Sequence, residues 1–379
     1  MTMAADKQDK VLNVPTLRFP EYSDKWLECE LQDIADLSKG AGISKDQLSE
    51  TAESCILYGE LYTKYKSEVI SNVVSKTDIE STNLVRSKAN DVIIPSSGET
   101  AIDISTARCV PYDNILLGGD LNIIRLKNQD GRFFSYQLNG VRKLDIAQIA
   151  QGVSVVHLYG ESLKRLKVRY PSKSEQEKIS SLLSVLDERI EAQSRIIEKL
   201  QSLIIGLEQI LLKTQSDWRT CYIGDVLSIG SGKDYKHLSE GNIPVYGTGG
   251  YMLSVNDFLY DGDSVCIGRK GTIDKPIYLQ GRFWTVDTLF YTHDFRGILP
   301  RYCYYLFQTI NWQMYNEASG VPSLSKDTIE RIMIAIPDIE EQEKTCLVLD
   351  SVTQKISLEE SYLSKLQQQK SYLLSTMFI

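Results

Sequence analysis

An internal repeat is the feature that most constrains what this chain can fold into. The segment "PSKSEQEKI" (171–179) returns 166 positions later as "PDIEEQEKT" (337–345), and the two copies stay in register without a gap between residues 153 and 207. A weaker repeat, at an offset of 192, relates "KWLECELQDIADLSKG" (25–40) to "DWRTCYIGDVLSIGSG" (217–232). Two copies at so long a period are not a solenoid. The repeat predicts a pseudo-dimer, in which each half is a mixed segment followed by a helical segment.

The two helical segments, 171–214 and 337–379, carry the heptad pattern of a coiled coil. Apolar residues recur in alternating steps of four and three, which places them in one seam along each helix. Gln193 and Glu359 share a seam position in the two copies, and polar seam residues fix register and partner choice at a cost in stability. We predict that the helices pair with each other; the alternative is that each helix covers its own domain. The predicted pairing seam comprises Leu186, Ile190, Gln193, Ile197, Leu200, Leu207, Val352, Ile356, Glu359, Leu363, Leu366 and Leu373.

Each helix is expected to begin just after a proline. Ser172, with Glu175 three residues later, has the pattern of a capping box behind Pro171. The run "EQEK" (341–344) superficially suggests the E-x-K of a nuclease. The same letters begin both helices, however, so we interpret them as residues of the helix start.

The two mixed segments are rich in short β-type runs punctuated by glycine, asparagine and aspartate, such as "DVIIPSS" (91–97) and "DSVCIGRKGT" (263–272). We therefore predict an α+β fold with two strand-rich domains. The predicted boundaries are a tail at 1–16, a first domain at 17–170, a helix at 171–214, a second domain at 215–336 and a helix at 337–379.

Composition bounds the class of protein. With 42% hydrophobic and 24% charged residues, the chain is typical of a soluble globular protein. The beginning of the sequence has no apolar signal-like region, and the most apolar helical stretch (203–212) is too short to span a bilayer. Seven cysteines and three histidines are scattered without C-x-x-C spacing, so neither a zinc site nor a disulfide framework is expected. A reducing cytoplasm fits this pattern.

Sequence signatures of catalysis are missing. "GSGKDY" (230–235) lacks the upstream glycine of a phosphate loop, and neither H-E-x-x-H nor G-x-S-x-G occurs. The sequence therefore predicts a binding protein, with no catalytic residues, no metal and no cofactor of its own.

The charge distribution is compatible with a nucleic acid as the ligand. The net charge is −8, but each mixed segment contributes only −2 and the helices carry the remainder. Several loops of the mixed segments combine small residues with tyrosine, serine, threonine, lysine or arginine, types that reach phosphates and base edges. Any one of these residues is equally explained as part of a surface turn. The DNA-binding candidates are Lys39, Tyr58, Tyr62, Lys64, Ser96, Ser97, Lys233, Tyr235, Lys236, Tyr246, Thr248, Arg269, Lys270 and Thr272.

The whole pattern resembles the specificity subunit of type I restriction-modification systems. The repeated "P-x-x-x-EQEK" helix start carries the resemblance, as do "LRFPEYSDKW", "GELYTKY", "DVIIPSSGET", "IPVYGTGGY" and "SGVPSLSKDTIERIMIAIP". The resemblance extends from Leu17 to Phe378. It implies two target-recognition domains, each reading one half of a bipartite DNA sequence, and an antiparallel coiled coil that sets the gap between them. The more polar seam of the second helix, at Glu359 and Lys370, departs from an ideal two-stranded coil.

The same resemblance implies a non-catalytic subunit with several partners. These are double-stranded DNA, two modification (methyltransferase) subunits and motor-nuclease restriction subunits, which would handle S-adenosylmethionine, ATP and Mg²⁺. Two alternatives stay open: a subunit of a methylation-only or other multisubunit system, and a coiled-coil scaffold without a DNA role. The scaffold does not explain two dissimilar domains rich in glycine and tyrosine.

Overall fold

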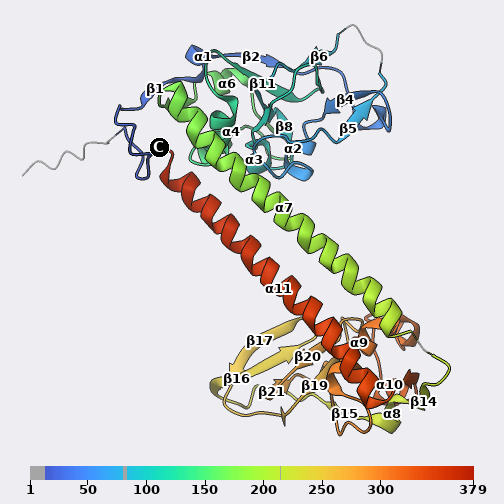
Figure 1. The fold of residues 1–379 in the computed structure, drawn as a ribbon. Coiled ribbons are helices and arrows are strands. Elements are labelled where there is room, and N and C mark those ends of the chain that lie inside the picture. Colours follow the sequence, from blue (N-terminus) through green and yellow to red (C-terminus); the bar gives the residue numbers. More distant parts are fainter. Residues whose placement is uncertain (1–12, 80–82, 214) are drawn as a thin grey trace, which may run out of the picture. The chain divides into compact units, whose positions relative to one another are not determined.

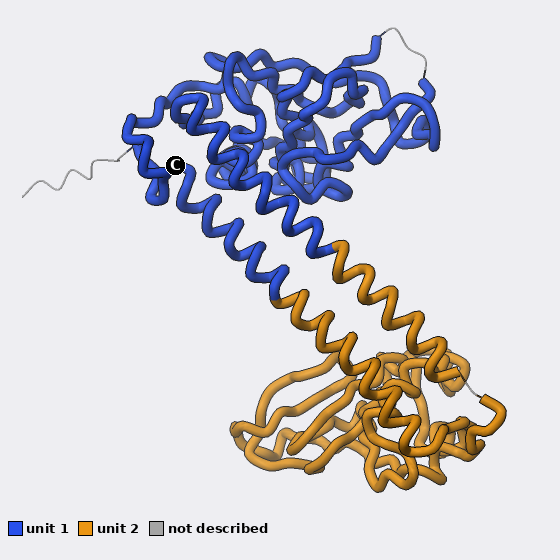
Figure 2. Tube along the Cα trace, in the orientation of Figure 1, with its two compact units in different colours: residues 1–194, 362–379 blue, residues 195–361 orange. Residues whose placement is uncertain are grey.

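The computed structural model describes residues 13–79, 83–213 and 215–379. It divides into two compact units, residues 1–194 with 362–379 and residues 195–361 (Figure 2). Each unit combines one strand-rich domain with part of each long helix, α7 (Lys173–Leu211) and α11 (Ile339–Thr376). The fold is α+β, with two strand-rich domains and two long helices, as predicted. Of the predicted tail at 1–16, residues 1–12 lie outside the described residues.

The first unit is built around a four-stranded sheet in the order β2-β11-β7-β9, of which Figure 1 labels β2 and β11. Isoleucines of β11 and β7, which pair antiparallel, are fully buried, and α4 contacts β7 and β9. The four strands are β2 (Ala35–Lys39), β11 (Leu121–Leu126), β7 (Asp91–Pro95) and β9 (Arg108–Val110). The smaller sheets combine β3 (Leu48–Ser49), β5 (Ser75–Thr77), β4 (Glu53–Ile56), β10 (Leu116–Leu117) and β6 (Val85–Arg86); β1 (Leu27–Glu30) and β13 (Lys167–Tyr170); β12 (Val156–His157) and β8 (Ser97–Gly98). The short helices are α1 (Leu31–Ile34), η1 (Lys45–Gln47), α2 (Glu60–Thr63), α3 (Ala101–Ile104), α4 (Gly131–Asn139), α5 (Lys143–Ile149) and α6 (Gly160–Lys164).

The second unit repeats the central sheet and the two-stranded pair beside it, whereas its second sheet differs from the five-stranded sheet of the first unit. Its strands β15 (Ser228–Ser231), β22 (Leu289–His293), β19 (Ser264–Gly268) and β20 (Ile277–Leu279) form one sheet. A second sheet contains β17 (Gly250–Val255), β16 (Glu240–Gly247), β21 (Arg282–Thr285) and β18 (Tyr260–Asp261), and β14 (Arg219–Tyr222) pairs with β23 (Met333–Ile336). The short helices are α8 (Ile223–Val226), α9 (Pro300–Thr309), η2 (Trp312–Tyr315) and α10 (Lys326–Glu330).

The helices run antiparallel within the first unit. The segment 17–18 contacts Glu175 at the start of α7 and Thr376 at the end of α11, whereas further along α7 Asp187 meets Lys370 at 2.6 Å. Within the second unit, the end of α7 shares an apolar cluster with Cys346 and Leu349 of α11. All twelve residues of the predicted seam are buried or half-buried.

The glutamine of the repeated motif explains why the motif occurs twice. Gln176 is fully buried; its Nε2 donates to the carbonyl of the motif proline (2.9 Å), and its Oε1 accepts from the backbone N of Asp130, the N-cap of α4 (3.1 Å). Gln342 makes the same bonds in the second unit, to its motif proline (3.0 Å) and from the backbone N of Leu299, the N-cap of α9 (2.8 Å). Each glutamine therefore fastens the start of a long helix to the strand-rich domain of its own unit.

The glutamate of the first copy has a different role from the predicted one. Instead of completing a capping box with Ser172, the buried Glu175 carboxylate accepts two hydrogen bonds from the Arg18 guanidinium, at 2.7 Å each. A bidentate, charge-assisted pair of this kind is stronger than the hydrogen bond of a neutral cap.

Candidate nucleic-acid interface

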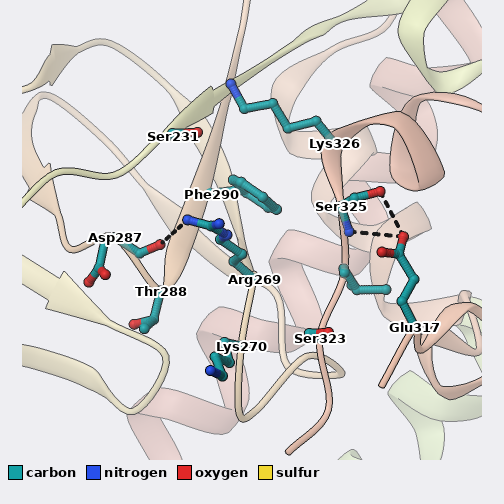
Figure 3. A pocket seen from close by; sticks show the side chains of 11 residues that line it. Ser231, Arg269, Lys270, Asp287, Thr288, Phe290, Glu317, Ser323, Ser325 and Lys326 are labelled. Atoms are coloured by element: carbon teal, nitrogen blue, oxygen red, sulfur yellow. Dashed lines mark hydrogen bonds between the residues drawn. The ribbon is translucent and has the colours of Figure 1, made fainter. Parts of the chain in front are cut away.

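A polar cavity of about 650 Å³ opens on the second unit beside the central sheet (Figure 3). We call it the second-unit pocket. Arg269 and Lys270 line it from the loop after β19, and Lys326 lines it from the start of α10. Phe290 of β22 is buried and lines the same cavity, together with the exposed Asp287. Three cations from two separate elements thus line one cavity.

The backbone of the Arg269 loop is held tightly, although its side chains are exposed. The Arg269 backbone N donates to Thr288 O (2.8 Å), and its carbonyl accepts from the Leu324 backbone N (2.9 Å). Glycine is required on both sides of the cations, because a Cβ on Gly268 would lie 2.0 Å from Thr272 O and Gly271 has a φ of +93°. A hydrogen-bonded backbone that carries exposed cations suits the recognition of a charged ligand, since little backbone entropy is lost on binding.

The charged groups of the pocket differ in whether their neighbours already bind them. Glu317 accepts hydrogen bonds from the Thr328 hydroxyl and from the backbone N (3.2 Å) and hydroxyl (2.7 Å) of Ser325, and these bonds lower the pKa of its carboxyl. Its charge therefore braces the pocket wall. Arg269 Nη1 donates a long hydrogen bond of 3.5 Å to the backbone O of Asp287, so its guanidinium is available to a ligand (Figure 3). Such a site can bind a phosphate or the edge of a base.

The structure brings some of the other predicted residues of this unit to the same surface. Lys233 and Lys236 are exposed in the loop after β15, and the backbone N of Lys233 donates to Thr285 O (2.8 Å). Thr248, in the turn between β16 and β17, faces Gly271: a Cβ there would lie 3.8 Å from its hydroxyl. Thr272 is half-buried in the loop itself.

Two predicted tyrosines of the second unit contribute to packing instead. Tyr235 packs against the apolar cluster that contains Val245 and Trp284. Tyr246 packs edge-on against Tyr251, with ring centroids 6.2 Å apart. Their rings are half-buried, so packing limits what they offer to a ligand.

In the first unit, the structure does not support the two predicted serines. Ser96 and Ser97 are 5% and 8% exposed, because they lie where the chain leaves β7 and pairs with the segment around β12. This burial argues against an open DNA contact in the free chain, and their place in the DNA-binding set stays a prediction. Lys64 is also engaged, since its ammonium binds Glu60 (2.7 Å) and the Ser75 hydroxyl (2.9 Å).

The remaining candidates of the first unit are half-buried or exposed. Tyr58 lies just before α2 and Tyr62 lies within it; both are half-buried, and Tyr62 Oη would lie 3.6 Å from a Cβ on Gly98. Lys39 is exposed at the end of β2.

The pocket also contains residues that the sequence interpretation missed. Lys326 and Asp287 were not singled out, because single charges beside a helix start or in a turn are common on any surface. The repeat offered a signal for Lys326: at the offset of 166 it aligns with Gly160, so a cation replaces a glycine at a matched position.

The described residues contain neither a cluster of three or more potential metal ligands nor a helix long and apolar enough to cross a membrane. Burial raises the pKa of the Cys266 thiol to about 12 and that of Cys346 to about 11, so neither has the lowered pKa of a reactive thiolate.

Comparison with known proteins gives a consistent result. The model of the type I restriction modification DNA specificity domain family matches residues 23–202 and again residues 215–368. A putative type I specificity subunit of Mycoplasma genitalium is 30% identical over 146 residues, a match that spans 34% of this chain and only 38% of that protein.

Two solved structures share the fold. The crystal structure of a type I restriction-modification S subunit from M. genitalium is 21% identical, with a TM-score of 0.71 over 97% of this chain and 99% of that chain. A chain from a study of complex assembly and conformational transition of the type I R-M system is 15% identical, with a TM-score of 0.56 over 93% of this chain and 97% of that chain.

Proposed function

Because this chain belongs to the family of type I restriction-modification DNA specificity proteins, we propose that it is the DNA-reading subunit of such a complex. Proteins of this family are specificity components and are not themselves catalytic. In our proposal, the chain binds a bipartite double-stranded DNA target in a sequence-specific manner. Each strand-rich domain reads one half-site and so directs methylation and restriction by partner subunits.

The second-unit pocket is the observation that carries this proposal. Arg269 and Lys270 are exposed on a rigid loop, and Lys326 lies across the same cavity. Arginine binds the O6 and N7 acceptors of guanine with two parallel bonds, whereas lysine serves best as a phosphate contact. A cavity with both kinds of cation can therefore position a duplex and read it.

The long helices supply the surface for protein partners. Several apolar side chains point outward from them: Ile210 and Leu347 are each 70% exposed and Leu358 is 64% exposed. Exposed apolar residues of this kind are typical of protein interaction sites. We propose that two modification subunits dock on the helices and that motor-nuclease restriction subunits join them. S-adenosylmethionine, ATP and Mg²⁺ are then bound by these partners, and the complex works in the cytoplasm.

The decisive experiment is carried out with the whole chain and its genomic neighbours. Methylation mapping in a host that expresses them should reveal one bipartite motif, and the purified complex should bind that motif with an affinity that falls steeply with salt. A chain that binds DNA neither specifically nor in a salt-dependent way would support the scaffold alternative. A complex that methylates without restricting would support a methylation-only system.

A further inference from the structure

The two units share one backbone framework at the edge of the central sheet. In the first unit, the ladder of β2 and β11 pairs Lys39 with Asn122; in the second, the ladder of β15 and β22 pairs Ser231 with Phe290. The loop after the neighbouring strand corresponds too. Leu158 N donates to the carbonyl of residue 96 at 2.9 Å, as Leu324 N does to that of residue 269 at 2.9 Å.

These matched bonds give a residue-by-residue correspondence. Lys39 stands where Ser231 stands, Asn122 where Phe290 stands, and Gly160 where Lys326 stands. The first relation has the offset of 192 and the last the offset of 166 that the sequence repeats show. The second-unit pocket should therefore have a counterpart in the first unit.

Such a counterpart exists as a cavity of about 270 Å³, which we call the first-unit pocket. Lys39, Asn122, Tyr159, Gly160 and Lys164 line it. The cations lie on different walls of the two pockets. The pocket has no cation at the positions of Arg269 and Lys326, where Ser96 and Gly160 stand, but it gains Lys39 from β2 and Lys164 from the end of α6.

The lining also offers an unmet hydrogen-bond acceptor. Asn122 is 1% exposed; its Nδ2 donates to Leu158 O at 2.9 Å, whereas its Oδ1 makes no hydrogen bond among the described residues. A Cβ on Gly160 would lie 3.7 Å from that oxygen, so the acceptor faces another lining residue of the pocket. A buried acceptor without a partner costs stability, and a ligand or water donor reaching it would recover that cost.

The rim of the pocket carries an exposed aromatic residue. Tyr159 is 47% exposed and stacks on His157, with ring centroids 6.0 Å apart and planes at 25°. The second unit has Ser325 and Ser323 at these positions. Lys164 is paired with Glu161 at 2.6 Å, but that carboxylate is 79% exposed, so the pair is weak and a phosphate can compete for the lysine.

We infer that the first-unit pocket is a second DNA site, in which Lys39 and Lys164 hold a backbone phosphate and Asn122 Oδ1 presents an acceptor to a base amino group. The inference rests on the proposed function and extends it to residues of the other half-site. Amino donors in the major groove are N6 of adenine and N4 of cytosine. The second-unit pocket has an aromatic ring in place of this acceptor, so the two pockets favour different bases at equivalent places.

The test compares charge variants of the full chain in its complex. Lys39→Ala with Lys164→Ala should weaken binding and reduce the slope of log affinity against log salt by about 0.9 for each phosphate that the protein no longer neutralises. The matched control is Lys127→Ala with Lys167→Ala, which removes two exposed lysines of the same unit outside this pocket and should leave the slope unchanged.

A gain-of-charge variant guards against misfolding. Gly160→Lys imitates Lys326 of the second unit, and the new Cβ would approach the rest of the described chain, outside its own helix and its two neighbours, no closer than 3.7 Å. This variant should raise the salt slope by about 0.9.

Footprinting distinguishes a failure of the first-unit assignment from a failure of the proposed function. The Lys39/Lys164 variant should lose protection over one half-site, and an Arg269→Ala/Lys270→Ala variant over the other. An unchanged footprint for the Lys39/Lys164 variant, or losses at the same half-site for both variants, would overturn the first-unit assignment alone. A wild-type complex without any salt-dependent footprint would instead overturn the proposed function.

Discussion

A buried charge cluster in the first unit provides the sharpest test of how the end of α11 is held there. Lys370 Nζ lies 2.6 Å from Asp187 Oδ1 and also binds the carboxylate of Glu68. The three side chains are 15%, 7% and 9% exposed. Tyr136 (2.7 Å) and Ser67 (2.9 Å) donate further hydrogen bonds to Asp187. One lysine of α11 therefore pairs with two carboxylates, one from α7 and one from the strand-rich domain.

Replacing Lys370 by methionine keeps the volume and removes the charge. Breaking a buried ion pair from one side costs about 3–5 kcal/mol, because the partner is left as an uncompensated buried charge. Here two carboxylates are left, so we expect at least the lower end of that range. Adding Glu68→Gln and Asp187→Asn to the lysine variant should restore most of the loss, since no buried charge of the cluster remains.

Native-state hydrogen exchange of residues 366–373 measures this effect locally. A global unfolding curve is less suitable, because a chain with two compact units need not unfold in two states. Lys370→Met should lower protection by about a hundredfold or more, at about 1.4 kcal/mol per tenfold change. Lys365→Met, which changes an exposed lysine of the same helix, is the control and should change it little. Equal protection in the two methionine variants would refute the reasoning.

Two further predictions concern recognition. Arg269→Ala or Lys270→Ala should weaken specific binding by about 1–3 kcal/mol if the side chain reads a base edge. Arg331→Ala, which changes an exposed arginine of the same unit, is the control. Normal binding and methylation by both loop variants would place this loop away from DNA. Exchange of residues 216–336 for the matching domain of a relative should change one half-site in the methylation map and leave the other, because Gln342 and the helices that hold the domain are retained; a change in both half-sites would show that recognition is shared.

The repeat made the architecture predictable, because residues at matching positions of the two halves occupy matching places in the fold. The repeat at the offset of 166 includes Gln176 and Gln342, each of which joins a long helix to its own strand-rich domain. This joint needs a glutamine at the same position in each half. The heptad steps indicated the paired helices, since an apolar seam on a long helix has to be covered. The offset of 192 matched Lys39 to Ser231, and the β ladders give the same correspondence.

Other parts of the molecule keep their geometry while the residue types change places. Tyr136 donates to Asp187 and lies 3.4 Å from the Ser184 hydroxyl. Its counterpart Tyr305 donates to Asp350 at 2.6 Å and lies 3.4 Å from the Thr353 hydroxyl. Residues 184 and 350 are aligned in the repeat, as are 187 and 353, so acid and hydroxyl have exchanged positions. Aligning the two halves by residue type does not reveal this exchange, because either an acid or a hydroxyl can accept a hydrogen bond from the tyrosine.

The candidate site was less predictable than the fold, because exposure depends on tertiary neighbours. Ser96 and Ser97 have the composition of a binding loop, but pairing with the segment around β12 buries them. Lys64 has the charge for a phosphate contact, but Glu60 and Ser75 engage it. In the second unit, the same backbone position presents Arg269 to solvent. Composition alone cannot distinguish these cases.

The helices should also act as a ruler between the half-sites. α7 has 39 residues, about 58 Å at 1.5 Å per residue. The contact between Asp187 and Lys370 implies that the bond after Leu200 in α7 lies opposite the bond after Ile356 in α11. Inserting one heptad after each of these two residues preserves the seam, because seven residues restore the coiled-coil register. A five-residue insertion at both points is the control. It rotates the following seam by about 140° at 100° per residue and should abolish activity.

The heptad lengthens each helix by about 10 Å, or about three base pairs at 3.4 Å each. Three base pairs also turn the second half-site by roughly 100° at about 10.5 base pairs per turn. A supercoil with a pitch near 150 Å turns only about 25° over that length. The domains must therefore swivel at their glutamine joints to follow the DNA. Methylation mapping should show an unread gap about three base pairs longer if they swivel, and no activity if they do not. An active heptad variant that methylates at the original spacing would refute the ruler.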